Sequence, residues 1–227
     1  MRNLYKILCF LMLPLLCIAC NGNEDELIPV IKPVASGVMT DARDGYEYHW
    51  VRYNGLDWTV ENSHYNTNDD NCSIYTISTT GNVDSNQLEK YGYLYTYAGA
   101  LKAAPEGWRV PTDEDWKKLE KALGMTDNEA DAINWRGSFT ATLMKQDSTG
   151  TNLNFLYGGY RTAIMNSSSL KFHLMNDYGF YWTSTKDTTK GDSIIFYRKI
   201  LYNSPKVFRY STTCNNMFSV RFVRDAK

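Results

Sequence analysis

Hydrophobic and polar residues alternate most clearly near the start of the folded part of the chain. Residues 46–51 read Tyr-Glu-Tyr-His-Trp-Val, with a large aromatic side chain at every second position. This period of two indicates a β-strand with one buried face. Asn54-Gly55 follows, a dipeptide that favours the tight turn of a β-hairpin, and residues 56–60 return as a second strand. We therefore expect an opening hairpin.

The next segments have the spacing of helices. Apolar side chains between Leu94 and Leu101 recur at the i, i+3, i+4 and i+7 positions of one helical face, which predicts a helix there. A second helix is expected to begin after Thr112, an N-cap residue followed by three acidic residues that suit a helix N-terminus. Thr126 and Glu129 have the spacing of a capping box and predict a short third helix.

Beyond residue 136 the pattern favours strands. Residues 193–201 and 206–211 flank Asn-Ser-Pro at 203–205 and predict a hairpin with a longer turn. The last strand is expected to alternate, with Phe218, Val220 and Phe222 inward and Ser219, Arg221 and Val223 outward. Helices in the first half and antiparallel strands in the second indicate an α+β fold.

The N-terminus has a pattern of its own. Residues 7–19 form an uncharged apolar run after two basic residues. This run is shorter than the roughly 20 residues of a membrane span and suits a signal peptide over residues 1–19. It ends at Ala19-Cys20 and resembles the bacterial lipobox, in which the cysteine is acylated, although Cys17 departs from that pattern. We expect a lipid anchor on Cys20; an ordinary secretory signal is the alternative.

Residues 20–37 contain two prolines and little periodicity and are expected to form a flexible tether, with one domain over residues 38–227. The acidic run at 24–26 is similar to the export signals of surface lipoproteins in Bacteroides-like bacteria; a solvated linker is the alternative. The expected location is the outer membrane, held by lipid and facing the cell surface, with the periplasmic face left open.

Charge and candidate chemistry narrow the function. Without residues 1–19 the chain has 22 basic and 25 acidic residues and no basic stripe, which argues against a nucleic-acid partner. His49, His64 and His173 are scattered, and Asp69-Asp70 lack the spacing of a calcium loop. The sequence predicts no metal, no cofactor and no catalytic residue.

Two cysteines, Cys72 and Cys214, remain outside the signal region. In an oxidising compartment they could form a disulfide or stay as free thiols, and their spacing decides neither.

Several motifs occur in a fixed order along the chain, at residues 44–46, 58–62, 91–96, 105–116, 158–161, 181–185 and 218–225. Together they resemble the Fibrobacter succinogenes major paralogous domain, which is common in surface lipoproteins of gut bacteria. The resemblance covers roughly residues 38–225. Phe222 stands where members of that family often have cysteine, so a family disulfide at that position would be lost.

Residues 109–116 are also similar to the Arg-Leu-Pro-Thr signature of formylglycine-generating-enzyme-like domains. This second resemblance implies a C-type-lectin-like fold: a twisted antiparallel sheet, two main helices, long loops, and adjacent N- and C-terminal strands. Enzymes of that class use two neighbouring cysteines, whereas Cys214 has no near partner in the sequence. We therefore expect no catalysis, with an enzyme of this class as the alternative.

The remaining expectation is a module that binds glycan or a surface protein through aromatic-rich loops. Four residues are candidates for stacking on a ligand, with packing in the core as the alternative: Tyr157, Tyr160, Tyr181 and Trp182. A purely structural role in a surface assembly is a further alternative. A large exposed aromatic patch would favour binding over scaffolding.

Overall fold

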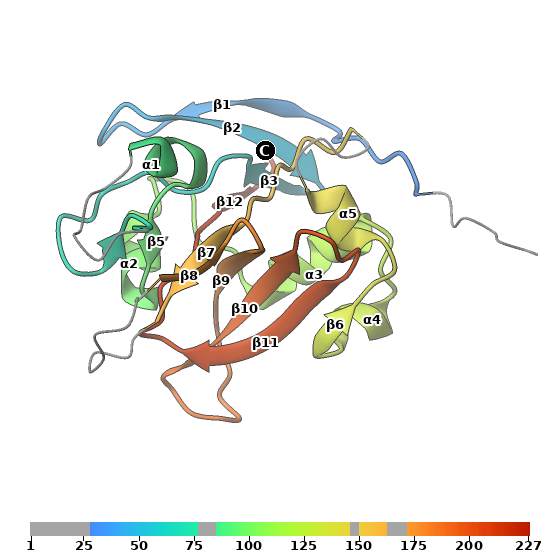
Figure 1. Ribbon diagram of the computed structural model, residues 1–227. Coiled ribbons are helices and arrows are strands. Elements are labelled where there is room, and N and C mark those ends of the chain that lie inside the picture. Colours follow the sequence, from blue (N-terminus) through green and yellow to red (C-terminus); the bar gives the residue numbers. More distant parts are fainter. Residues whose placement is uncertain (1–27, 77–84, 146–149, 163–171) are drawn as a thin grey trace, which may run out of the picture.

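The computed structural model describes residues 28–76, 85–145, 150–162 and 172–227. The expected signal peptide, Cys20 and the acidic run at 24–26 lie outside these residues. In the described part of the chain, strands form two larger sheets and one small one, with short helices beside them (Figure 1). The α+β prediction is therefore confirmed.

The first sheet contains both ends of the domain. Its order is β1-β2-β3-β12, from β1 (Ser36–Thr40), β2 (Glu47–Tyr53), β3 (Leu56–Thr59) and β12 (Val223–Asp225). The predicted hairpin is β2 and β3, and Asn54 and Gly55 supply the positive φ angles, 47° and 78°, that its turn requires. β12 pairs with β3, so the last strand lies in the N-terminal sheet.

The domain begins before residue 38. β1 starts at Ser36, and the Val34 amide already donates to the Arg52 carbonyl at 3.1 Å. Ile31 packs against the hydrophobic core. The C-terminal part of the segment expected to be a tether therefore belongs to the domain, because it pairs with β2.

The second sheet has the order β6-β11-β10-β9-β7-β8. Its strands are β6 (Asn134–Arg136), β7 (Gly158–Arg161), β8 (Phe172–Met175), β9 (Tyr178–Lys186), β10 (Ile194–Leu201) and β11 (Val207–Thr213). Neighbours pair antiparallel except β7 and β9, which pair in parallel at Gly159 and Gly179. β10 and β11 form the hairpin predicted around residues 203–205. The small sheet joins β4 (Cys72–Ser73) to β5 (Leu94–Tyr95).

The helices of the described residues are short: α1 (Ser85–Tyr91), α2 (Tyr97–Ala103), α3 (Asp113–Ala122), α4 (Asp127–Asp131) and α5 (Thr140–Met144). The sequence pattern did not indicate α1. The helix expected from Leu94 begins at Tyr97, because the two residues of β5 pair with β4 and Thr96 is the N-cap. The predicted caps Thr112 and Thr126 are confirmed, each in a capping box.

The predicted alternation of the last strand is wrong. Residues 217–223 are all buried. Phe218 bridges to Tyr95 of the small sheet and Ser219 bridges to Tyr181 of the six-stranded sheet, so both edges of this segment are paired and the side chains on both of its faces are enclosed. Arg221, expected to point outward, is enclosed and donates to Asn62 Oδ1 at 2.7 Å and to the Leu153 carbonyl at 3.0 Å. Its burial is tolerated because its donors are satisfied.

Candidate ligand-binding groove

Helix α3 covers one face of the six-stranded sheet and lies behind it in Figure 1. The contact is a buried ion network. Arg198 of β10 donates to Asp113 at 2.6 Å and to Glu120 at 2.7 Å. Arg209 and Arg136 bind the same two carboxylates from β11 and β6. Every charge in this network is paired, and the network holds the strands against α3. The opposite face of the sheet, which we call the front face, has no part in the network.

Strand alternation turns the neighbours of Arg198, Tyr197 and Lys199, to the front face. There a row of residues lies in register across four strands: Phe180 pairs with Lys199, Lys199 with Phe208, and Phe208 with Trp135. Cross-strand partners share a face, so their side chains touch. The ring centroids of Phe208 and Trp135 are 5.1 Å apart.

A groove of about 520 Å³ opens on this front face, a size typical of small-molecule sites. We call it the aromatic groove, and define it by its ten lining residues: Tyr160, Thr162, Leu174, Phe180, Tyr197, Lys199, Thr212, Thr213, Asn216 and Phe218. Four of the ten residues are aromatic, three are threonines and one is an asparagine. None of the described lining residues is a carboxylate, a histidine or a cysteine.

The aromatic residues of the groove touch one another. Tyr160 packs on Phe180 with centroids 4.8 Å apart, and Phe218 lies 5.1 Å from both Phe180 and Tyr197. Phe180, Tyr197 and Phe218 are almost buried and form the floor, whereas Tyr160 is partly exposed. Burial, followed by the nearby Tyr210 and Tyr160, raises the pKa of Tyr197 to about 12. Its phenol is therefore protonated at neutral pH and can donate a hydrogen bond.

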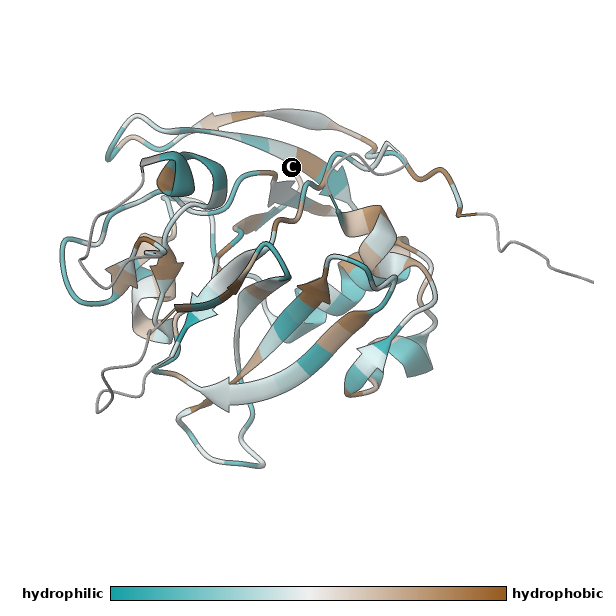
Figure 2. Ribbon diagram, in the orientation of Figure 1, coloured by the Kyte–Doolittle hydropathy of each residue, from teal (hydrophilic) through white to brown (hydrophobic). Residues whose placement is uncertain are grey.

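The aromatic surface continues from the groove along β11. Phe208 and Tyr210 lie beyond Tyr197, with centroids 6.2 Å apart for Tyr197 and Phe208 and 6.0 Å for Phe208 and Tyr210. Tyr210 is exposed. In Figure 2 most of β11 is pale or teal, because its residues are aromatic, hydroxyl-bearing or charged rather than aliphatic. Rings of this kind offer an apolar face and a polar edge to a ligand.

Lys199 is the one cation among the described groove residues. Its ammonium lies 4.0 Å from the Phe208 centroid and 5.2 Å from that of Trp135, with Tyr178 and Phe180 slightly farther. Burial lowers the pKa of Lys199. Aromatic faces attract a cation but do not neutralise its charge.

Leu174 of β8 forms one wall of the groove in an unusual backbone conformation. Its φ is +63°, in the left-handed region that a bulky residue rarely adopts. Its side chain is nevertheless 42% exposed, so burial does not compensate for the strain. Strain of this kind gathers at binding and catalytic sites.

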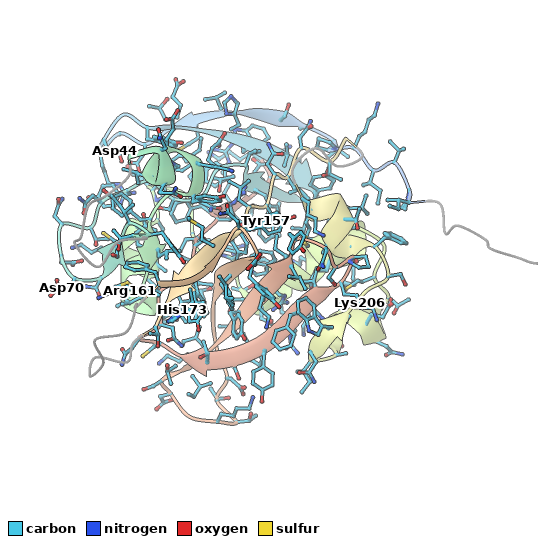
Figure 3. The ribbon with its side chains drawn as sticks, viewed as in Figure 1. Asp44, Asp70, Tyr157, Arg161, His173 and Lys206 are labelled. Atoms are coloured by element: carbon cyan, nitrogen blue, oxygen red, sulfur yellow. The ribbon has the colours of Figure 1, made fainter. Side chains whose placement is uncertain are left out.

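The structure separates the four predicted stacking residues. Tyr160 lines the aromatic groove. Tyr157 is partly buried against the hydrophobic core, and in Figure 3 it lies at the end of β7 remote from His173, the cross-strand partner of Tyr160.

Tyr181 and Trp182 do not lie on a binding surface, which corrects that part of the prediction. Both are 0% exposed. Tyr181 packs on Phe155 and hydrogen-bonds the Leu156 backbone, and Trp182 packs on Phe218 and donates to the Tyr95 carbonyl at 2.7 Å. Aromatic content alone could not separate these core rings from Tyr160.

Sequence reasoning missed Phe180, Tyr197, Lys199 and Phe218. A signal was available, because the period of two in residues 194–201 puts Tyr197 and Lys199 on the face opposite Arg198. What it could not supply was the register that sets Lys199 between Phe180 and Phe208, since pairing between distant strands is not encoded locally.

The disulfide left open between Cys72 and Cys214 is not formed; both cysteines are free thiols. Cys72 Sγ contacts the Asn66 side chain and the Thr67 amide, each at 3.4 Å, and Cys214 Sγ contacts Asn215 Oδ1 at 3.5 Å. The two thiols thus have separate polar neighbours.

A second cleft, of about 460 Å³, lies beside β1 and β2. There His49 Nδ1 is 2.8 Å from Glu61 Oε1, in an exposed pair. The cleft is also lined by Trp50. The indole ring of Trp50 lies against Gly37, where an added Cβ atom would come within 2.5 Å of the ring. The second cleft therefore offers a ligand one tryptophan ring, partly covered by Gly37, whereas the aromatic groove is lined by four aromatic residues.

Metal-ligating chemistry is absent from the described residues: no group of three or more histidine, cysteine, aspartate or glutamate side chains could hold an ion. Asp69, which the sequence singled out, accepts hydrogen bonds from Thr67 at 2.6 Å and Lys102 at 2.9 Å, and these contacts lower its pKa. No helix in this part of the chain has the length and apolarity to cross a bilayer.

Fold and groove together describe an α+β protein with an aromatic, hydroxyl-rich groove on one face of its six-stranded sheet. The family model of the Fibrobacter succinogenes major domain matches residues 51–224. The chain belongs to that family, as its motifs indicated. Neither the curated proteins nor the solved structures contain a match to it.

Proposed function

We propose that this chain is a lipid-anchored protein of the outer membrane whose domain binds a glycan in the aromatic groove without transforming it. The observation that carries the proposal is the aromatic groove itself. Tyrosine and phenylalanine rings line an open 520 Å³ groove together with threonine and asparagine side chains. Concave sites with a few polar groups among aromatic rings are the usual form of small-ligand sites.

A sugar ring matches both the aromatic rings and the polar side chains of this surface. Its C–H faces pack on aromatic rings, and its hydroxyls need partners that both donate and accept. The hydroxyls of Thr212 and Tyr197 do both. Asn216 Nδ2 donates to Thr212 Oγ1 at 2.9 Å, which orients the Thr212 hydroxyl. A protein partner is the second candidate, favoured by the extension of the aromatic surface to Tyr210.

The C-type-lectin-like arrangement is part of the proposal. Three features support it: mainly antiparallel sheets, long loops between short helices, and the pairing of β12 with β3 in the N-terminal sheet. The enzyme alternative needs a reactive thiol at the site, and Cys214, whose Sγ contacts Asn215 Oδ1, lies outside the described lining of the groove.

The test is a glycan array probed with the full-length chain purified in detergent. We expect binding to a restricted set of glycans and a loss of at least about tenfold in affinity for Tyr160→Ala, since stacked aromatic contacts contribute on the order of 1 kcal/mol or more each. Tyr202→Ala is the matched control, because Tyr202 is 54% exposed and does not line the groove. Absence of binding to any glycan, or full binding by a folded Tyr160→Ala chain, would overturn the proposal.

A further inference from the structure

The aromatic groove carries a net positive charge in its described lining. Lys199 contributes that charge, and no aspartate or glutamate among the described lining residues offsets it. Several other lysines of the described chain bind carboxylates: Lys117 binds Asp131 at 2.7 Å and Lys102 binds Asp69 at 2.9 Å. The ammonium of Lys199 contacts aromatic rings instead.

Lys145 gives a close comparison within the same chain. It is also half-buried, and burial also lowers its pKa. Its ammonium, however, donates to the Ser204 carbonyl at 2.6 Å and to the Tyr202 carbonyl at 3.0 Å. Lys199 has no such oxygen acceptor among the described residues, so its three donors are available to a ligand.

The strand register explains why Lys199 stays in place. Lys199 is on β10, which has β9 on one side and β11 on the other. Its cross-strand partners are Phe180 on β9 and Phe208 on β11. The rings on either side restrict the side chain and exclude water from one side of the ammonium. A charge in such surroundings gains more from an opposite charge than it would in open water.

We infer that the aromatic groove selects a glycan bearing a negative group on its sugar ring, a carboxylate or a sulfate ester, which binds the ammonium of Lys199. This inference rests on the proposed function and narrows its ligand class. The sugar ring packs on Tyr160 and Tyr197, and the acidic group accepts charge-assisted hydrogen bonds from Lys199. One ammonium matches one negative group per bound sugar.

The experiment is calorimetric titration of the full-length chain in detergent with three probes: an oligogalacturonate, its methyl ester, and a sulfated galactan oligosaccharide. The ester keeps the ring and loses the charge. We expect the oligogalacturonate or the sulfated probe to bind at least about tenfold more tightly than the ester, because hydrogen bonds to charged groups are the stronger ones. The two acidic probes distinguish carboxylate from sulfate recognition.

Variants locate the effect. Lys199→Met should weaken binding of the acidic probe at least about tenfold while leaving the ester unaffected, and Lys199→Arg should retain most of the preference. Lys206→Met is the matched control, because Lys206 is an exposed lysine in the turn of the same hairpin (Figure 3). Thermal unfolding checks that Lys199→Met is folded; methionine suits the aromatic surroundings. Binding of the acidic probe should also weaken as pH rises through the lowered pKa of Lys199.

Each outcome separates this inference from the proposed function. Equal binding of acid and ester, or full binding by Lys199→Met, would overturn the acidic preference and leave glycan binding intact. Failure of all three probes and of every glycan on the array would overturn both. Binding of polyglutamate as tightly as the oligogalacturonate would assign the charge recognition to a protein ligand and overturn the sugar assignment.

Discussion

At the scale of single residues, Leu174 combines backbone strain with an exposed position in the groove wall. A left-handed conformation costs a non-glycine residue roughly 1–2 kcal/mol, and asparagine tolerates it better than leucine. We therefore expect Leu174→Asn to raise the free energy of unfolding by up to about 1 kcal/mol and to weaken ligand binding. Leu174→Ile should lower stability, since a β-branched residue fits this conformation worse. Urea denaturation measures both; the reverse order would contradict the strain.

Asp113 gives a second prediction at the residue scale. Burial alone would raise its pKa, but hydrogen bonds from Arg209 and the charge of Arg198 outweigh burial and hold the pKa below its ordinary value of 3.8. A carboxylate whose pKa is depressed by folding stabilises the fold above the unfolded pKa and loses that contribution as pH falls. The protein should therefore lose stability progressively below about pH 4.

Asp113→Asn tests this account. It should cost about 3–5 kcal/mol at neutral pH, because Arg198 and Arg209 lose their shared carboxylate in the interior, and it should flatten the acid dependence. Asp127→Asn is the control, since the pair of Asp127 with Lys121 is exposed and should matter by less than about 1 kcal/mol. Urea unfolding measured between pH 3 and 7 makes the comparison, and similar losses for both variants would exclude the network.

At the scale of elements, the N-cap of α3 holds the helix that backs the groove-bearing sheet. Thr112 Oγ1 accepts from the Asp115 amide at 3.1 Å, and Asp115 accepts from the Thr112 amide at 2.8 Å. We expect Thr112→Ala to lower the free energy of unfolding by about 1–2 kcal/mol. Thr126→Ala removes the same cap from the five-residue helix α4 and should cost less. Equal losses of unfolding free energy for the two variants would show that the position of α3 against the sheet does not increase the contribution of its N-cap.

Elements with local causes could be predicted from the sequence. The hairpin of β2 and β3 follows from alternation and Asn54-Gly55, and the starts of α3 and α4 follow from their capping residues. The last strand could not, because Ser219 and Arg221 are buried by contacts with segments distant in the sequence. The groove was predicted only through Tyr160, since its floor depends on strand register.

At the scale of the whole molecule, we propose that a lipid anchor on Cys20 holds the binding domain at the membrane. Two acyl chains hold a protein firmly, whereas one binds reversibly. We expect Cys20→Ala to move the chain from the membrane fraction to the soluble fraction while leaving its unfolding and ligand binding unchanged. Fractionation and immunoblotting measure this, and a Cys20→Ala chain that stayed with the membrane would contradict lipid anchoring.

The central claim is that the aromatic groove is the ligand site, and NMR titration of the isotope-labelled full-length chain tests it most directly. A glycan selected on the array is added, and backbone and aromatic shifts are followed. The account predicts the largest shifts at groove residues on β7, β10 and β11, including Tyr160, Tyr197 and Thr212, and little change at Trp50 in the second cleft. Shifts centred on Trp50 and Glu61, with the groove unchanged, would contradict it.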